Sequence, residues 1–464
     1  MSALSSETIE ELRSSIRGEI VLPEDSNYDE VRAIWNAMID RKPAVIVRCS
    51  GVADVMSSIE FAKANDLVLA VRGAGHNIAG SALCDDGIVI DLSQLRSVRV
   101  DPEKRRAWVS PGATLGDLDH ETQAFGLATP VGINSTTGVA GLTLGGGFGW
   151  LTRKYGLTVD NLVSADVVTA DGEFLKASES ENEDLFWAIR GGGGNFGIVT
   201  AFELELHPVG PEVTAGLIVF PGDQALQVLQ QYREMSSGLP EEANVWVVLR
   251  KAPPLPFLPE DVHGTDVVVL AVFHAGEHGK AEQLFAPLRA FGDPVGEHVG
   301  QMPYTAWQQA FDPLLTPGAR NYWKSHNFTE LSDGAMKVIS EYAGKLPSAQ
   351  TEIFIGLLGG EASRVPVDAT AYSSRDAEYV MNVHGRWDDP SEDETVIGWA
   401  RDFFAATTEF ASGSVYVNFL TADEQERIAA AYGPNYDRLA KIKARYDPEN
   451  LFRTNQNIRP AGTE

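Results

Sequence analysis

Three glycine-rich segments in the first 200 residues place the strongest constraint on how this chain can fold. They are residues 72–77 (RGAGHN) with Gly80, residues 132–149 (GINSTTGVAGLTLGGGFG) and residues 190–197 (RGGGGNFG). Glycine makes up 44 of 464 residues, against roughly 7% in average usage. Glycine allows left-handed backbone and close approach to a ligand, and runs of free N–H groups bind anions such as a pyrophosphate. One such segment could be a tight turn, but three in one region favour a large anionic cofactor.

A dinucleotide-binding Rossmann motif is the main competing interpretation. Residues 192–197 match G-x-G-x-x-G, but that motif follows a strand and opens a helix. Here the glycines follow a helical stretch, residues 183–189, and lead into a strand. We therefore exclude a Rossmann site. The chain also lacks the P-loop, the H-E-x-x-H zinc motif and the G-x-S-x-G nucleophile elbow.

The charge and the cysteine content exclude several further classes. The formal net charge of −28 disfavours nucleic acid as a partner, because phosphate binding needs a basic patch. Two cysteines, Cys49 and Cys84, cannot build a disulfide framework or a four-thiolate metal site, so we expect no metal. The start has no basic segment followed by an apolar run, and the chain has no 18-residue apolar stretch. We expect a cytoplasmic protein that is not bound to membranes.

The order of apolar runs predicts an α+β protein with two domains and a returning tail. Two strands, residues 44–48 and 67–71, flank a helix over 52–64, and a hairpin is expected over 167–175. From residue 214, five strand-like runs alternate with helices, which predicts a sheet with helices on one face and a free opposite face. The helices are expected at 224–236, 280–291, 333–342 and 394–410, and the domains at 1–208, 209–415 and 416–464.

His76 differs from the other eight histidines because it lies among glycines directly after a buried strand. It could be a hydrogen-bonded turn residue, or an imidazole that acts as a nucleophile or ligand at the cofactor.

Together these segments resemble the berberine bridge enzyme-like branch of the vanillyl-alcohol oxidase flavoprotein superfamily. The matching motifs are residues 71–77, residues 138–156 (GVAGLTLGGGFGWLTRKYG), Asp160 with Asn161, residues 190–200, residues 416–419 (YVNF) and residues 443–458 (KARYDPENLFRTNQNI). The resemblance implies a PCMH-type FAD-binding domain, formed by residues 1–208 and the tail. It also implies a substrate domain with a large antiparallel sheet.

The resemblance implies that FAD is attached covalently through a ring nitrogen of His76 to the flavin 8α-methyl group. Many relatives carry a second tether, a cysteine eleven residues before the GGG run, where this chain has Asn134. We therefore expect one covalent bond. The residues expected along the pyrophosphate are Arg72, Gly73, Ala74, Gly75, Asn77 and Ser81, and those expected at the rest of the FAD are Asn134, Gly138, Gly141, Leu142, Gly145, Gly149, Ile198, Asn418 and Asn455.

The same resemblance implies hydride transfer to flavin N5 while a base removes a proton from the substrate. Tyr416 matches the base and Tyr155 its hydrogen-bonded partner, although each could be an ordinary half-buried aromatic. For the substrate we expect Asn382 and His384, which share one face of a strand. This departs from the lysine, glutamine or glutamate of relatives, and a strand histidine can also be structural.

The sequence therefore predicts an FAD-dependent oxidase that acts on a hydroxyl- or amine-bearing carbon of a small molecule. Oxygen is the expected electron acceptor, because Thr137 lies at the position that screens the flavin and is small. The alternatives are a dehydrogenase with another acceptor and a flavin-binding protein without turnover. The substrate and the oligomeric state stay open.

Overall fold

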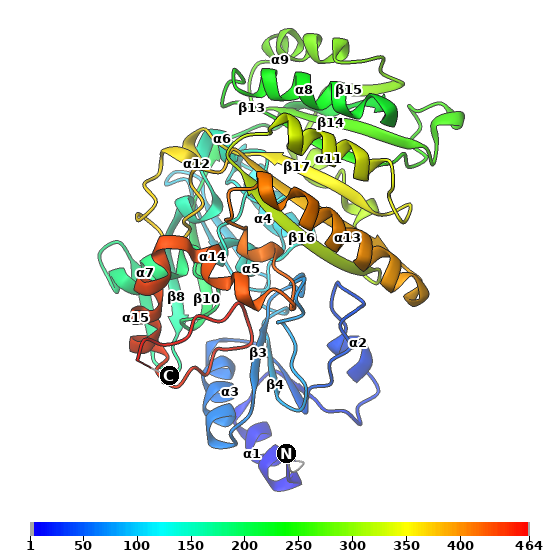
Figure 1. Cartoon of the computed structure of the whole chain (residues 1–464). Helices are drawn as coiled ribbons and strands as arrows, with labels where there is room; N and C mark the ends of the chain where they lie inside the picture. The colour runs from blue at the N-terminus through cyan, green and yellow to red at the C-terminus, as the bar shows by residue number, and fades with distance from the viewer. Residues whose placement is uncertain (1–3, 463–464) are drawn as a thin grey trace.

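The computed structural model describes residues 4–462, which form two lobes with a long sheet across the upper one (Figure 1). The lower lobe contains the N-terminal half of the chain and the C-terminal segment. The predicted α+β class with a large antiparallel sheet is confirmed. None of the described helices is long and apolar enough to cross a membrane.

A small, mostly parallel sheet forms the base of the lower lobe. The strands run in the order β1 (Glu19–Val21), β2 (Val45–Arg48), β4 (Ile88–Asp91) and β3 (Leu69–Arg72). The predicted strand–helix–strand unit is present, with α3 (Val52–Ala64) between β2 and β3, but β4 pairs between the two strands. The helices α1 (Ser6–Ser15) and α2 (Tyr28–Arg32) complete this part. β3 ends four residues before His76, so this buried sheet fixes the start of the loop that carries His76.

A second, antiparallel sheet completes the lower lobe. Its strands are β5 (Val98–Asp101), β6 (Arg106–Val109), β10 (Ile198–Glu205), β8 (Leu162–Val168) and β9 (Phe174–Ser178). The predicted hairpin joins β8 to β9, with Gly172 at φ +76°. Around it lie β7 (Leu127–Ala128), β11 (His207–Pro208), α4 (Leu115–Gln123), α5 (Val139–Leu144), α6 (Thr152–Tyr155) and α7 (Glu183–Ile189). Because α7 precedes the glycines and β10 follows them, the order used to exclude a Rossmann site is confirmed.

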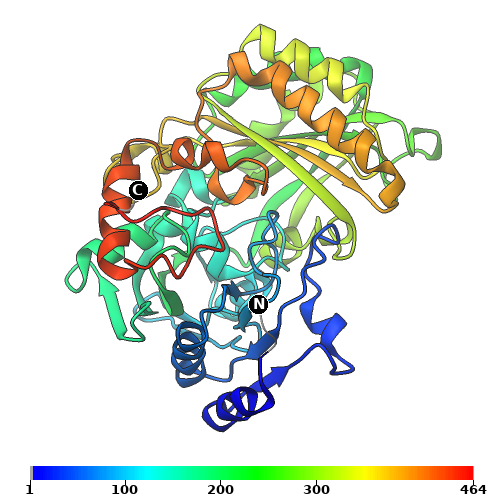
Figure 2. The same ribbon diagram turned by 60° about the horizontal axis from the view of Figure 1, so that its bottom comes forward.

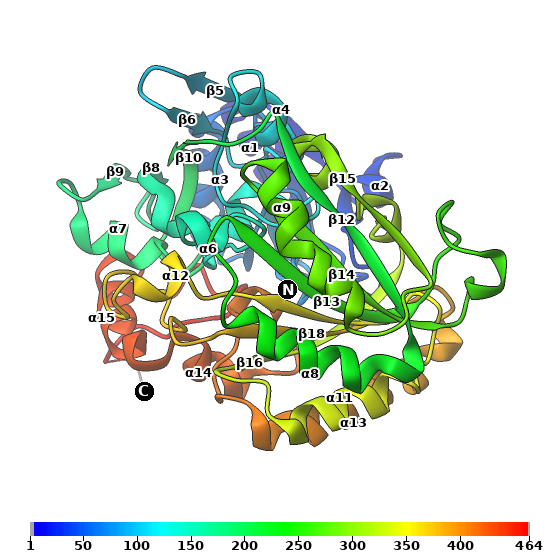
Figure 3. The ribbon, with the colours of Figure 1, turned by 90° about the horizontal axis from the view of Figure 1, so that it is seen from above.

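Seven antiparallel strands form the upper sheet, seen from above in Figure 3. In order they are β15 (Gly296–Pro303), β12 (Glu212–Pro221), β14 (Asp266–His274), β13 (Ala243–Lys251), β17 (Glu352–Leu357), β18 (Tyr379–Trp387) and β16 (Arg320–Phe328). The sequence predicted five of them. It missed β15 and β16 because both carry many polar residues, so neither forms an apolar run.

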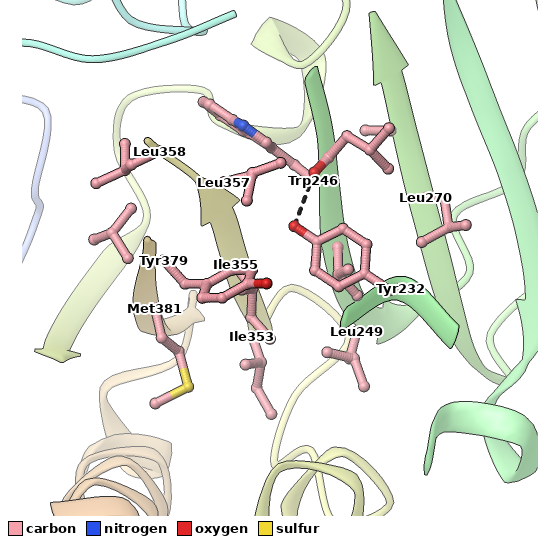
Figure 4. Packing of buried hydrophobic residues seen from close by; sticks show 14 of the residues in the cluster. Tyr232, Trp246, Leu249, Leu270, Ile353, Ile355, Leu357, Leu358, Tyr379 and Met381 are labelled. Atoms are coloured by element: carbon pink, nitrogen blue, oxygen red, sulfur yellow. Dashed lines mark hydrogen bonds between the residues drawn. The ribbon is translucent and has the colours of Figure 1, made fainter. Parts of the chain in front are cut away.

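Helices cover one face of this sheet, as predicted, and leave the other face towards the lower lobe (Figures 1 and 3). They are α8 (Ala225–Ser236), α9 (His278–Phe285), α11 (Asp333–Ala343) and α13 (Asp393–Thr407), with the short α10 (Tyr304–Gln308) and α12 (Glu361–Arg364) nearby. The helix predicted over 280–291 ends early because Pro287 cannot donate a helical hydrogen bond; residues 286–290 form a 3₁₀ turn instead. Figure 4 shows the buried packing beneath the helices, where Tyr232 donates a hydrogen bond to the Val245 carbonyl.

The C-terminal segment returns to the lower lobe and lies beside its strands (Figure 2). It contains α14 (Ile428–Tyr432) and α15 (Tyr436–Tyr446), separated at Gly433 and Pro434 as predicted. Lys443 on α15 is fully buried and donates hydrogen bonds to Asp447 and to the Asn195 carbonyl. This buried pair fixes the tail to the third glycine-rich segment.

Candidate functional site

A cavity of about 400 Å³ lies between the free face of the upper sheet and the lower lobe. This volume is in the range of cofactor and ligand sites. The predicted site residues that line it are Gly73, Ala74, Gly75, His76, Asn77, Ser81, Asn134, Gly138, Gly141, Leu142, Ile198, Asn382, His384, Tyr416, Asn418 and Asn455. Segments far apart in the sequence thus meet at one cavity.

We name two walls of this cavity. The cofactor wall consists of lining residues from 73–82, 132–144, 193–199, 416–418 and 454–456. The sheet wall consists of Leu217, Val219, Trp246, Val248, Arg250, Val267, Val269, Ala271, Trp323, Glu352, Phe354, Asn382 and His384.

His76 lies on the cofactor wall in the loop that follows β3. Its ring stacks on Trp35, with centroids 5.0 Å apart and planes 21° apart. Burial lowers the pKa of His76 to about 4, so the imidazole is neutral near pH 7. A neutral ring keeps one nitrogen lone pair, which nucleophilic attack requires.

The hydrogen bonds around His76 determine which nitrogen carries that lone pair. Asn134 Oδ1 accepts hydrogen bonds from both the Thr136 hydroxyl, at 2.7 Å, and the Thr136 backbone N–H. Since the Thr136 proton is used in this way, its oxygen accepts the hydrogen bond from His76 Nε2 at 2.9 Å. Nε2 is then protonated, and the lone pair is on Nδ1. Asn134 therefore orients the histidine through Thr136.

The cofactor wall leaves room where side chains would otherwise project. A Cβ added to Gly141 or Gly194 would meet no atom within 4 Å, although both glycines line the cavity. Asn455 donates hydrogen bonds to the Gly194 and Phe452 carbonyls, while its buried Oδ1 has no partner in the described chain. Empty space beside exposed backbone, with an unused acceptor, fits an extended polar cofactor such as FAD.

Three predicted cofactor residues lie behind the cavity lining. The Arg72 guanidinium donates a hydrogen bond to the Val31 carbonyl, which supports the loop. A Cβ on Gly149 would lie 1.9 Å from the Val131 carbonyl oxygen, and one on Gly145 would lie 2.3 Å from Asn418. These glycines allow close packing of the wall itself.

Tyr416 is on the cavity side of the C-terminal segment and is 3% exposed. Its hydroxyl oxygen accepts hydrogen bonds from the Gly147 backbone N–H at 3.1 Å and from Asn418 Nδ2 at 2.9 Å. Burial raises the pKa of Tyr416 to about 12, and the two donated bonds partly oppose this shift. The third glycine of the GGG run thus contacts the tyrosine directly.

The predicted hydrogen bond between Tyr155 and Tyr416 is wrong. Tyr155 stacks on His207, with centroids 4.0 Å apart, and its hydroxyl lies 3.5 Å from the Pro208 carbonyl oxygen. Gly156, at φ +80°, ends α6 and turns the chain directly after this tyrosine. The partners of Tyr416 come instead from Gly147 and Asn418.

On the sheet wall, the alternation predicted for β18 is confirmed. Asn382 and His384 line the cavity, whereas Met381 and Val383 pack into the core beneath the helices. His384 contacts Glu352 Oε1 through Nδ1, at 3.3 Å, and Asn321 Oδ1 through Nε2, at 3.1 Å. Burial lowers the pKa of His384, and its bond to Glu352 opposes the shift.

Sequence reasoning missed several residues of this site. Trp35, Thr136 and Gly147 act through contacts with predicted residues, and no pattern around them indicates this. Arg250 and Glu352 form a buried ion pair at 2.7 Å on the sheet wall. Arg250 lies near the end of the apolar strand β13 and Glu352 begins the apolar strand β17. Charged residues in such strands could have indicated a buried ion pair.

Comparisons with known proteins agree with this arrangement. Residues 43–178 match the FAD binding domain family, and residues 415–459 match the berberine and berberine like family. The chain is similar to (R)-6-hydroxynicotine oxidase of Paenarthrobacter nicotinovorans, with 34% identity over 97% of this chain and 98% of that protein.

Two solved structures have the same fold. The crystal structure of 6-hydroxy-D-nicotine oxidase from Arthrobacter nicotinovorans has a TM-score of 0.84 and 31% identity, and the match covers 96% of this chain and 98% of that one. The xylooligosaccharide oxidase of Myceliophthora thermophila, in complex with xylobiose, has a TM-score of 0.84 and 26% identity, with 98% and 100% covered. Family models match residues 43–178 and 415–459, and a relative that is 34% identical covers 97% of the chain. The protein therefore belongs to the berberine bridge enzyme-like family of FAD-linked oxidoreductases.

Proposed function

We propose that the protein is an oxidase that removes two electrons and two protons from a hydroxyl- or amine-bearing carbon of a small molecule. Bound FAD would supply the acceptor for the hydride of the substrate C–H bond, at its N5 atom. The second proton leaves the substrate oxygen or nitrogen and is taken by Tyr416. Dioxygen would then take up the two electrons together with the two protons removed from the substrate, including the one held by Tyr416, and would leave as hydrogen peroxide.

The arrangement at Tyr416 is the observation that carries this proposal. Its oxygen lies at the cavity and accepts two hydrogen bonds, which stabilise the phenolate form that can take a proton. Because the pKa of Tyr416 is about 12, the phenolate fraction grows as pH rises. We expect flavin reduction to become faster with pH for this reason.

His76 is the proposed attachment point, through Nδ1. The support is the hydrogen bond that Thr136 donates to Asn134 and the one that His76 Nε2 donates to Thr136, which together leave the lone pair on Nδ1. Asn134 cannot form a thioether, so we propose a single tether. Among the other predicted residues, Asn77, Ser81, Gly138, Leu142 and Ile198 are proposed to contact FAD because they line the same wall.

An anaerobic substrate panel tests the function. Purified protein is mixed with alcohols, cyclic amines and sugars, and loss of flavin absorbance is followed, after which air is admitted. We expect one compound class to reduce the flavin and air to restore its absorbance rapidly, with one peroxide formed per reduction. Slow recovery in air with fast recovery by an artificial acceptor would identify a dehydrogenase. Failure of the whole panel would favour a flavin-binding protein without turnover.

Thr137 supports oxygen as the acceptor, because this small side chain lines the cavity on the cofactor wall. Replacing Thr137 with leucine is expected to slow recovery in air while leaving anaerobic reduction unchanged. Equal recovery in both proteins would argue against a role for this position.

A further inference from the structure

The side chains of the sheet wall are ordered in two neighbouring rows that cross the strands. One row runs Val219, Val269, Val248, Phe354 and Asn382, each opposite the next on adjacent strands. The second row runs Val267, Arg250, Glu352, His384 and Trp323. The first is apolar up to its final amide, and the second contains the ionisable groups.

The apolar row and its surroundings define the body of the ligand. Phe354 packs edge-on against Trp246, with centroids 4.9 Å apart, and the β13–β14 loop adds Leu255 and Leu258 to the lining. A sugar lying on the apolar residues of this row would lose water from several hydroxyls that these residues cannot bond, at a cost of roughly 1–3 kcal/mol each. An aromatic or branched aliphatic body fits this surface.

Arg250 and Glu352 in the second row balance each other, but a further buried cation lies beside this row. Glu352 is the partner of Arg250, and despite its burial this arginine and His384 keep the pKa of Glu352 below its usual value. Arg386, 1% exposed, lies beside this row and binds only neutral oxygens, from Gln350, Asn321 and Thr316. No described carboxylate forms an ion pair with it. The two guanidinium groups therefore outnumber the one carboxylate of this wall, and the other carboxylate acting on Arg386 is the exposed Asp388, so an anion beside them is favoured.

Two polar groups on this wall still have free hydrogen-bonding capacity. Arg250 Nη2 has no partner among residues 4–462, although Nη1 and Nε are both bonded. Asn382 is 4% exposed and lines the cavity, and its Oδ1 has no partner within the described chain. Phe354 lies between these two groups, because it is opposite Asn382 and two residues beyond Glu352. A molecule lying on Phe354 can reach both.

We propose that the substrate is a ring-sized apolar alcohol or amine that carries an anionic group such as a carboxylate. The anion binds Arg250, the apolar body lies on Phe354 and its neighbours, and Asn382 accepts a hydrogen bond from the hydroxyl or amine. The inference rests on the proposed function in placing the substrate on the sheet wall.

Binding of compounds that cannot be oxidised tests this inference separately from turnover. Isothermal titration calorimetry of the holoprotein compares 3-phenylpropionate, its neutral amide and cellobiose. We expect the acid to bind about tenfold tighter than the amide, as a charge-assisted hydrogen bond gives, and cellobiose to bind weakest. Equal binding of acid and amide, or tighter binding of cellobiose, would overturn the proposal whether or not any substrate reduces the flavin.

Variants locate the effect. Arg250→Gln should remove the preference for the acid, while Arg320→Gln, on β16 outside the cavity, should keep it. If Arg250→Gln fails to retain FAD, Arg250→Gln/Glu352→Gln removes both charges of the pair and is expected to lose the preference too. An unchanged preference for the acid in Arg250→Gln or in the double variant, with or without a shifted flavin potential, would refute the proposal.

Discussion

The two walls of the cavity present different parts of the polypeptide to their ligands. The cofactor wall exposes backbone and empty space at glycines such as Gly141 and Gly194. The sheet wall exposes side chains that alternate along six strands, so that one residue of shift would replace Asn382 with Met381. A wall of backbone offers few side chains whose exchange could alter its ligand. A wall of side chains can change its ligand one residue at a time.

Filling the space on the cofactor wall should have the largest effect. Gly141→Leu places a side chain in the cavity at a helical position, so the fold should be retained while FAD is excluded. The flavin-to-protein absorbance ratio of the purified variant measures this. Val269→Phe adds similar bulk to the sheet wall and should retain FAD while raising KM. Loss of FAD from both variants would remove the distinction between the walls.

Removing the Tyr416 hydroxyl should come next. Tyr416→Phe is expected to slow anaerobic flavin reduction by about 10²–10⁴-fold with FAD still bound, the usual contribution of a positioned base. The wild-type rate should rise with pH, towards the pKa of about 12, and the variant rate should lose that slope. Stopped-flow absorbance between pH 6 and 10 measures both. Tyr155→Phe serves as the control and should behave as wild type, because Tyr155 lies outside the cavity lining.

Breaking the hydrogen bonds that link His76 to Thr136 and Asn134 should have an intermediate effect. Thr136→Val removes the acceptor for His76 Nε2, so both ring tautomers become available and the fraction of covalently bound flavin should fall. Flavin fluorescence on a denaturing gel and the mass of the peptide containing His76 measure this fraction. Thr129→Val is the matched control, because the buried Thr129 hydroxyl has no partner in the described structure. If all of the flavin in Thr136→Val were covalently bound, the hydrogen bond from His76 to Thr136 would not be needed for attachment.

The smallest effect is expected from Asp119, which lies at the contact between the two lobes. Asp119 on α4 accepts a hydrogen bond from Gln308 on α10, and burial raises the pKa of Asp119 to about 7. The folded state therefore binds this proton more tightly than the unfolded state. The carboxyl costs no stability below about pH 4, and the cost grows to at most about 4 kcal/mol above pH 7.

Asp119→Asn should therefore raise the melting temperature at pH 8 and leave it nearly unchanged at pH 4.5. Asp447→Asn is the contrast, because it leaves the buried Lys443 ammonium without its carboxylate and should lower the melting temperature. A gain for Asp119→Asn at pH 4.5 as large as that at pH 8 would contradict the assigned pKa.

The sequence predicted the cofactor wall better than the sheet wall, and the reason is physical. Glycine runs and His76 show directly where backbone must approach a ligand, and the resemblance assigned most of their neighbours. On the sheet wall, Asn382 and His384 followed from alternation in one strand. Arg250 and Glu352 required the register between β13 and β17, which depends on pairing between residues about 100 positions apart. The false pairing of Tyr155 came from the resemblance, because a matching motif does not give the direction of a side chain.

The C-terminal segment is the last part of the chain to be synthesised, and it completes the cofactor pocket. Its Asn455 and Lys443 bind the Gly194 and Asn195 carbonyls, and Tyr416 completes the cavity from the same segment. A nascent chain that has produced all three glycine-rich segments still lacks this closing side. We therefore expect stable binding of FAD to require nearly the whole chain, so that a protein without its cofactor precedes the FAD-bound form.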